Sequence, residues 1–400
     1  MSVDPHLLLN PAVVQDPYAF YDEVRATAPV WRVGDSNVYL VTAFEPLADA
    51  ARRIEDFSSE LTALLYRDDR GLPATLPVDL GPPTLSIADP PTHTLHKQLI
   101  FPRFVSKRMA LIEDDLTAFT NACLDKIETM HAFDFMAEVG GAVPIHAIST
   151  LIGFRNSNER KLLETAYESS ELTGGTMTLE EMRRSLTRKD EIFAWLEDQL
   201  NARDGKNSED LLDAIKAAIN SGELSMGQGL ITMVTLLSAG AESTASLLGN
   251  AVGLLAARPQ VVAALKQNME LLPDFIEEAG RLESPFRHHL RSVPHDTELG
   301  GVPIPAGSVV MLMWGAANRD PEKFADPSAL KLERRPQHVT FGRGIHLCVG
   351  AALARMEARI VLTAMLKREN FPVLSAVDKP DWEYSLMVRR YRRLPMSWQR

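Results

Sequence analysis

The stretch that decides this fold is Phe341-Gly-Arg-Gly-Ile-His-Leu-Cys348-Val-Gly350. It is a glycine-punctuated loop that leads into a helix and carries one cysteine at the junction. Gly342 and Gly344 permit tight backbone geometry and a close approach to a flat object. Cys348 stands at the expected start of a helix, where the helix dipole and free N–H groups stabilise a thiolate. Together with the positive charges of the same stretch, this pattern indicates a cysteine that binds haem iron.

The composition is that of an ordinary soluble globular protein, with 24% charged and 45% hydrophobic residues,. The formal net charge of −11 argues against a nucleic-acid partner, whose phosphates need a basic face,. Two cysteines, Cys123 and Cys348, exclude a disulfide framework, so a reducing cytoplasm fits best,. The most apolar run, from Gly229 to Ala241, is well short of the about twenty residues that span a membrane,. The first ten residues do not resemble a signal peptide,.

Helical patterns dominate the chain, and strand patterns are sparse. Helices are expected over Pro17–Thr27, Ser106–Glu128, Leu179–Asn201, Ser225–Ala257, Leu271–Leu282 and Gly350–Leu366. Alternating residues predict two hairpins, one from Val30–Val33 with Val38–Val41 and one from Val302–Pro305 with Val309–Leu312,. A last extended stretch is expected over Glu383–Trp398.

Two long segments, Glu60–Ser86 and Asn318–Thr340, are interrupted by prolines and fit neither pattern. Irregular segments of this length inside a compact protein are usually functional, or they hide an element that the pattern does not reveal. We favour the first interpretation and expect both segments to contribute to a site.

The cysteine loop resembles the haem-binding signature of the cytochrome P450 superfamily, and its histidine makes it similar to the soluble bacterial branch. The residues that carry the resemblance are Phe341, Gly342, Gly344, His346, Cys348 and Gly350. The resemblance implies haem b (iron protoporphyrin IX), with Cys348 as the axial ligand of the iron. It also implies that Phe341, Gly342 and Gly350 contact the cofactor.

The family fold is mainly α with small β-sheets, and the haem lies between a long distal helix and the helix after the cysteine loop. The resemblance implies one such domain over residues 1–400, with a β-rich part near 30–42, 297–312 and 383–398. This expectation replaces the two or three domains that a length of 400 residues suggests by itself,.

A second family motif, Glu-x-x-Arg, is matched by Glu278-Ala-Gly-Arg281. Residues three apart lie on one helix face and can form an ion pair. In the family a further arginine from the segment before the cysteine loop joins this pair. Alignment makes Arg334 that partner and leaves Arg335 as the alternative. The implied role is structural, because the triad would hold the loop that presents Cys348.

Four basic residues are expected to meet the haem propionates by resemblance to family motifs. They are His93 and Lys97 in Asp89-Pro-Pro-Thr-His-Thr-Leu-His-Lys97, Arg291, and His346 in the cysteine loop. Lys97 replaces an arginine that is common at its position, so the charge is kept and the bidentate fork is lost.

The apolar helix contains Ala239-Gly-Ala-Glu-Ser-Thr244, which resembles the oxygen-activating motif of the family. Ala239 and Gly240 are implied to lie against the haem, and Gly240 is expected to leave room for dioxygen. Glu242, Ser243 and Thr244 are the predicted catalytic residues, because an acid followed by an alcohol can order water and deliver protons. Ser243 stands where threonine is usual and lacks the methyl group that restricts the rotamer. We expect looser control of proton delivery.

The resemblance places substrate contacts in Glu60–Ser86, near Leu236 and Ala239, after the Glu-x-x-Arg helix, and near Leu386 and Met387. The first segment carries Leu61, Leu64, Leu65 and Tyr66, which favour an apolar ligand. The stretch Phe286-Arg-His-His289 stays open: Arg287 or His288 could anchor a substrate carboxylate, but a propionate or surface role is favoured.

The chain carries no flavin or nicotinamide motif, so an external ferredoxin or flavodoxin is the expected electron donor. A basic docking face is expected from Arg103, Lys107, Arg108, Arg343 and Arg355,.

The leading hypothesis is a soluble, cytoplasmic haem-thiolate monooxygenase that uses O2 to oxidise a small apolar molecule. The alternatives are oxidative coupling, desaturation or peroxygenase chemistry with the same cofactor, a haem protein that binds a ligand without turnover, or, least favoured, a haem-free helical scaffold.

Overall fold

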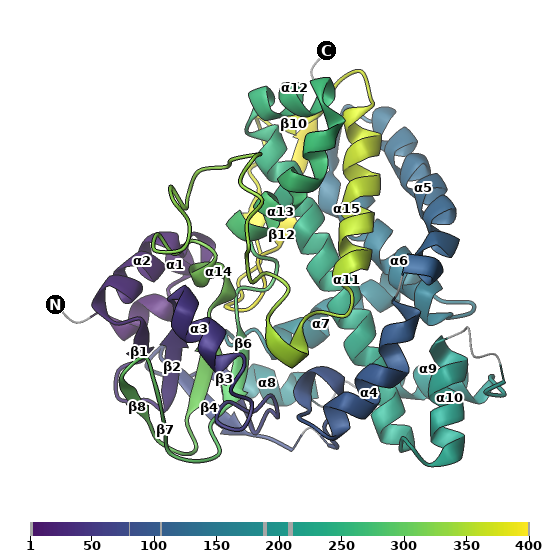
Figure 1. Cartoon of the computed structure of the whole chain (residues 1–400). Helices are drawn as coiled ribbons and strands as arrows, with labels where there is room; N and C mark the ends of the chain where they lie inside the picture. Colours follow the sequence, from purple (N-terminus) through teal and green to yellow (C-terminus); the bar gives the residue numbers. More distant parts are fainter. Residues whose placement is uncertain (1–2, 80, 105, 187–189, 207–210, 399–400) are drawn as a thin grey trace.

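The computed structural model describes residues 3–79, 81–104, 106–186, 190–206 and 211–398. Helices dominate, and the strands form small sheets (Figure 1). This is the mainly helical architecture with small sheets that the sequence predicts.

One long helix, α11 (Met226–Ala256), is the centre of the helical body. The hydroxyl of Ser225 accepts a hydrogen bond from the amide of Gln228, and the side chain of Gln228 accepts one from the amide of Ser225, which forms a capping box,. Around α11 pack α6 (Ala142–Ile152), α7 (Glu159–Leu172), α13 (Leu272–Leu282) and α15 (Ala351–Leu366). Among the described residues α11 is the one helix long and apolar enough to cross a membrane, and 67% of its most apolar window is buried inside the protein.

The remaining α-helices lie outside this group. They are α1 (Pro11–Gln15), α2 (Tyr18–Thr27), α3 (Phe44–Ala50), α4 (Thr92–Ile100), α5 (Ser106–Glu128), α8 (Leu179–Leu186), α9 (Asp190–Asn201), α10 (Leu211–Ser221), α12 (Pro259–Gln267) and α14 (Trp314–Ala317). Of these, α1, α2, α3 and α14 lie beside the main sheet (Figure 1). The helix expected over Leu179–Asn201 is therefore recorded as α8 and α9, and residues 187–189 between them lie outside the described residues. The other five expected helices are present to within a residue or two of their ends.

The main sheet has the strand order β1-β2-β9-β6 and lies beside the N-terminal helices, at the lower left of Figure 1. Its strands are β1 (Val30–Arg32), β2 (Val38–Val41), β6 (His289–Ser292) and β9 (Val309–Leu312). The first expected hairpin is confirmed, because β1 and β2 pair in antiparallel register.

The second expected hairpin is wrong. Strand β8 (Val302–Ile304) pairs with β7 (Thr297–Leu299), whereas β9 lies between β2, in parallel, and β6, in antiparallel register. All four residues of β9 are buried, so the strand gains most from a central position with neighbours on both edges,. The alternation around the turn at 306–308 is a local pattern, so it cannot predict which distant strands β9 pairs with.

The smaller sheets include a hairpin that the sequence analysis missed. Strands β3 (Ala63–Arg67) and β4 (Pro73–Pro77) pair inside the irregular segment 60–86. Prolines at both ends of β4 hid the strand, and such prolines are tolerated on an edge strand. The C-terminal stretch is extended as expected, with β11 (Asp381–Trp382), β12 (Tyr391–Arg393) and β13 (Pro395–Ser397). Strand β13 pairs with β5 (Ala132–Asp134) and β10 (Val373–Leu374).

Candidate active site

An open cavity lies between α11 and the cysteine loop, with about 1410 Å³ of empty space that includes its opening to solvent. It gathers most of the predicted site residues from four separate parts of the chain. Those lining it are His93, Lys97, Ala239, Gly240, Ser243, Thr244, Arg291, Phe341, Gly342, His346, Cys348 and Gly350. Glu242 does not line it.

The cysteine loop owes its shape to two glycines and one backbone hydrogen bond. Gly342 and Gly344 have φ values of +75° and +74°, which favour glycine,. A Cβ on Gly344 would lie 2.7 Å from the carbonyl oxygen of Ala51. The amide of Cys348 donates to the carbonyl oxygen of Phe341 at 2.9 Å and closes the loop.

The sulfur of Cys348 faces the cavity just before α15 begins at Ala351. Burial raises the pKa of the thiol, and the amides of Gly350 and Ala351 and the charge of Arg355 lower it. The helix start thus favours the thiolate as expected, but the surrounding protein outweighs it. An iron ion that replaces the proton would remove that penalty.

Basic side chains collect at one end of the cavity. The rings of His93 and His346 lie 4.4 Å apart between centroids, and Lys97 Nζ donates to the carbonyl oxygen of Ile345 at 2.5 Å. Burial, with the positive charges of His346 and Lys97, lowers the pKa of His93 to about 4. Burial lowers the pKa of Arg291 to about 10.

This donor set fits haem. A single thiol, an apolar gap between a glycine loop and a helix, and a cluster of N–H donors at one edge match an iron ligand, a flat ring and two carboxylates,.

The opposite wall is formed by α11. The hydroxyl of Ser243 donates to the carbonyl oxygen of Ala239 at 2.6 Å, so its lone pairs remain available toward the cavity. We expected Gly240 to leave room for dioxygen. However, a Cβ on Gly240 would lie 2.8 Å from Cγ1 of Ile148, a side chain on α6. Glycine is needed at this position because α6 packs so closely against α11.

The side chain of Glu242 forms an ion pair outside the lining of the cavity. Its side chain is 1% exposed, and Oε1 accepts a hydrogen bond from Arg390 Nε at 2.7 Å. Arg390 Nη2 also donates to Glu383 at 3.1 Å. Oε2 of Glu242 has no hydrogen-bond partner among the described residues. Burial raises the pKa of Glu242 to about 7, although Arg390 opposes that rise.

Arg390 and Glu383 were not among the predicted site residues. A cluster of arginines follows two acids in the C-terminal stretch, but nothing local links it to α11.

A family model described as Cytochrome P450 matches residues 176–393. The chain belongs to the cytochrome P450 family. It is 36% identical to Cytochrome P450 144 of Mycobacterium tuberculosis, over 100% of this chain and 93% of that protein. It is 30% identical to 6-deoxyerythronolide B hydroxylase of Saccharopolyspora erythraea, over 95% of this chain and 96% of that protein.

The solved structure of CYP109E1 from Bacillus megaterium in complex with testosterone is also similar. The TM-score is 0.87 at 26% identity, and the match covers 97% of this chain and 99% of that one. The protein is therefore a cytochrome P450 monooxygenase, and the family implies a haem cofactor.

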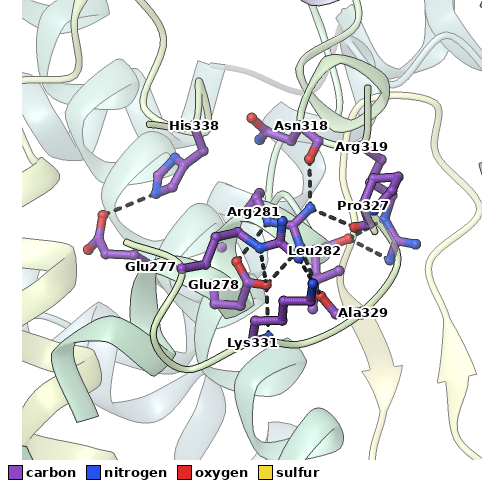
Figure 2. A network of polar contacts seen from close by, with 12 residues as sticks. Glu277, Glu278, Arg281, Leu282, Asn318, Arg319, Pro327, Ala329, Lys331 and His338 are labelled. Carbon is purple, nitrogen blue, oxygen red and sulfur yellow. Dashed lines mark hydrogen bonds and ion pairs between the residues drawn. The ribbon is translucent and has the colours of Figure 1, made fainter. Parts of the chain in front are cut away.

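In this cytochrome P450 the Glu-x-x-Arg motif forms a buried ion pair on α13 (Figure 2). Arg281 Nε and Nη2 each donate to Glu278 at 2.8 Å, and both side chains are fully buried. Arg281 also donates to the carbonyl oxygens of Asn318, Pro327 and Ala329. These bonds attach the irregular segment 318–340 to α13.

Arg334 is the third member of the network, because its Nε donates to Glu278 at 3.0 Å. Arg335 instead contacts Asp274, and its side chain is 82% exposed.

A second pair, which the sequence analysis missed, links α13 to α15. Arg355 donates to Glu277 at 2.6 and 2.7 Å, and its guanidinium lies 4.3 Å from the centre of the Phe341 ring. Of the five arginines and lysines expected in a docking face, Arg355 is thus engaged in the protein and Arg343 is exposed. The side chains of Arg103, Lys107 and Arg108 lie outside the described residues.

The expectations about the substrate side need correction. Arg287 and His288 are buried, Arg287 donates to the carbonyl oxygens of Val14 and Val388, and neither side chain lines the cavity. The favoured propionate or surface role is therefore wrong for both residues, and so is the alternative of a substrate anchor. Phe286 and His289, which follow the Glu-x-x-Arg helix, do line the cavity.

Of the apolar residues expected to bind substrate in Glu60–Ser86, Leu64, Leu65 and Tyr66 lie in β3 and Leu61 precedes it. Leu64 and Leu65 are buried in the core. Leu85 and Ser86 are the residues of that segment that line the cavity, while Leu386 and Met387 do not.

The triad predicts a sharp contrast between two adjacent arginines. Arg334→Ala removes a partner of a fully buried carboxylate, which should lower the free energy of unfolding by about 3 kcal/mol or more,. Arg335→Ala, the matched control, removes an exposed ion pair and should change it by less than about 1 kcal/mol,. Urea unfolding of the two variants measures both, and equal losses would contradict this account.

The raised pKa of Glu242 predicts that the free energy of unfolding depends on pH. Its folded pKa of about 7 lies above the ordinary 4.5, so the folded state binds that proton more tightly. The stabilisation is fully present below about pH 4.5 and is lost as the pH rises through about 7. Relative to Glu242→Gln, the wild type should therefore lose stability between those values. Urea titrations across this range test it, with the exposed Glu55→Gln as control; parallel curves for wild type and Glu242→Gln would refute the shift.

Proposed function

We propose that this cytochrome P450 inserts one oxygen atom of O2 into a small apolar organic molecule, with haem b bound between α11 and α15. The observation that carries the proposal is Cys348, which faces Ser243 and Thr244 across a cavity with a mostly apolar lining. The bound haem supplies oxygen activation, and the residues around it position the reactants and manage protons.

The residues that would hold the cofactor fall into three groups. Cys348 would bind the iron through its thiolate. The basic cluster of His93, Lys97, Arg291 and His346, which lines the cavity, would bind the propionates. Ala239 and Gly240 in one wall and Phe341, Gly342 and Gly350 in the other would enclose the ring.

Proton delivery is assigned to Glu242, Ser243 and Thr244. A carboxyl group with a pKa of about 7 can both accept and donate a proton near neutral pH,. Glu242 does not line the cavity, so its proton must pass through water or the hydroxyl of Ser243. Arg390 holds Glu242 in place and limits how far burial raises its pKa.

The lining of the cavity favours an apolar substrate. Its apolar side chains are Leu85, Phe104, Ile148, Leu236, Leu247, Phe286, Trp314 and Leu353. No acidic side chain is among the described residues that line it. A hydrophobic molecule would gain free energy in proportion to the apolar area that it buries there.

Electrons must come from a separate protein, because the sequence has no flavin or nicotinamide motif. We propose a ferredoxin or flavodoxin as the donor, a single domain over residues 1–400, and a cytoplasmic location.

Oxidative coupling, desaturation or peroxygenase chemistry with the same cofactor is the second candidate. Ser243 favours it, because a serine in place of threonine gives looser control of the proton that commits the enzyme to oxygen insertion.

The first experiment is the absorption spectrum of the reduced, carbon monoxide-bound protein. Wild type should show the strongly red-shifted Soret band of thiolate ligation, and Cys348→His should lose it. Cys123→Ser, a change to the other cysteine, should keep it. A wild-type band of the imidazole type would overturn the assignment of Cys348. With NADH as the electron source, an apolar substrate should then be oxygenated only when a ferredoxin or flavodoxin and its reductase are added.

The side chain at position 243 should affect how much hydrogen peroxide is released for each NADH that is consumed. Ser243→Thr adds the methyl group that restricts the rotamer, so it should form less hydrogen peroxide per NADH than the wild type. Ser243→Ala removes the hydroxyl and should form more. Peroxide assays during NADH consumption give both values. Equal or lower peroxide in the wild type than in Ser243→Thr would refute the proposed gating.

A further inference from the structure

His289 lies at the basic end of the cavity without a role in the assignments above. It is the first residue of β6, two positions before Arg291. Residues two apart in a strand point to the same face of the sheet, and both side chains line the cavity,. His289 is exposed to the open cavity.

Trp314 determines which nitrogen of His289 can donate. The indole Nε1–H of Trp314 donates to His289 Nδ1 at 2.7 Å. An indole N–H is a donor only, so Nδ1 must be the unprotonated nitrogen of a neutral ring. The proton of neutral His289 is therefore on Nε2, which is not bonded to Trp314.

The ring is held from two sides. The Phe286 ring meets it edge-on, with 5.5 Å between centroids and 84° between planes. Trp314 itself is 3% exposed and begins α14, so it is a rigid support. Because Nδ1 and one edge of the ring are engaged, Nε2 is the polar atom that His289 presents to the cavity.

The charges nearby keep the ring neutral. Burial, with the positive charges of Arg291 and His346, lowers the pKa of His289 to about 3. A neutral donor adds a hydrogen bond at this end of the cavity without a further positive charge beside Arg291, Lys97 and His346.

We propose that His289, fixed as the Nε2–H tautomer by Trp314, donates a hydrogen bond to a haem propionate beside Arg291. The inference rests on the proposed propionate site at Arg291. His289 is then a further cofactor-binding residue, and Trp314 is a positioning residue that acts through it.

The tautomer is tested first, by nitrogen NMR of protein labelled at histidine, in the reduced, carbon monoxide-bound form, which is diamagnetic. His289 should show a protonated Nε2 and an unprotonated Nδ1 in the wild type. In Trp314→Phe, which keeps an aromatic ring and removes the N–H donor, the two tautomers should mix. A protonated Nδ1 in the wild type would overturn the proposal.

Haem retention is the second readout, measured as the rate of haem transfer to excess apomyoglobin. His289→Phe should lose haem about tenfold faster than the wild type, as expected for a lost hydrogen bond to a charged group. Trp314→Phe should give a smaller increase, and it should add nothing in the His289→Phe background. Trp195→Phe, a tryptophan of α9 that does not line the cavity, should match the wild type.

The outcomes separate this inference from the assignment on which it rests. Faster haem loss in Arg291→Leu but not in His289→Phe would overturn the inference and keep the propionate site. No change in either would overturn both. Additive effects of Trp314→Phe and His289→Phe would show that Trp314 does not act through His289. If haem loss is unchanged in His289→Phe but binding of a carboxylate-bearing ligand weakens, His289 anchors substrate instead.

Discussion

The buried pair of Glu278 and Arg281 is the constraint on which the site depends. Two fully buried charges are costly unless every polar group is matched, and here backbone carbonyls of 318–340 complete the coordination of Arg281,. That segment is largely irregular, so it lacks the regular backbone hydrogen bonds of a helix or sheet that would satisfy those carbonyls,. Arg281 and Arg334 donate hydrogen bonds to them instead. They set the course of the chain from α14 to the cysteine loop and thus the place where Cys348 meets α11.

The cavity is built from two walls with different physical demands. The cysteine loop needs left-handed backbone at Gly342 and Gly344, and the absence of a side chain on Gly344 lets the chain pass close to Ala51. The α11 wall needs a close approach to α6, which Gly240 permits. Packing of α11 against α13 and α15, and the ion pairs that leave α13, hold the two walls at a fixed separation.

Charge is sorted to two sides of this cavity. Basic groups gather at one end, where burial and mutual repulsion lower their pKa values. A bound carboxylate would offset that repulsion. The acid, Glu242, lies outside the lining, with Arg390 and a free carboxylate oxygen. An apolar lining can therefore coexist with a proton donor, because the donor is kept in a separate polar cluster next to the helix that borders the cavity.

The sequence by itself determined the features that are encoded within a few consecutive residues. The Glu278–Arg281 pair lies within one helical turn, and the first hairpin is marked by its own turn residues. The cysteine loop is identified from its own residues and from their resemblance to a family signature. Only the tertiary structure decided the contacts between distant segments. Arg390 is 148 residues from Glu242, and Trp314 is 25 residues from His289. The central place of β9 and the need for glycine at 240 depend likewise on β6 and on Ile148. No local pattern records such partners, because burial and packing select them only once the whole chain has folded.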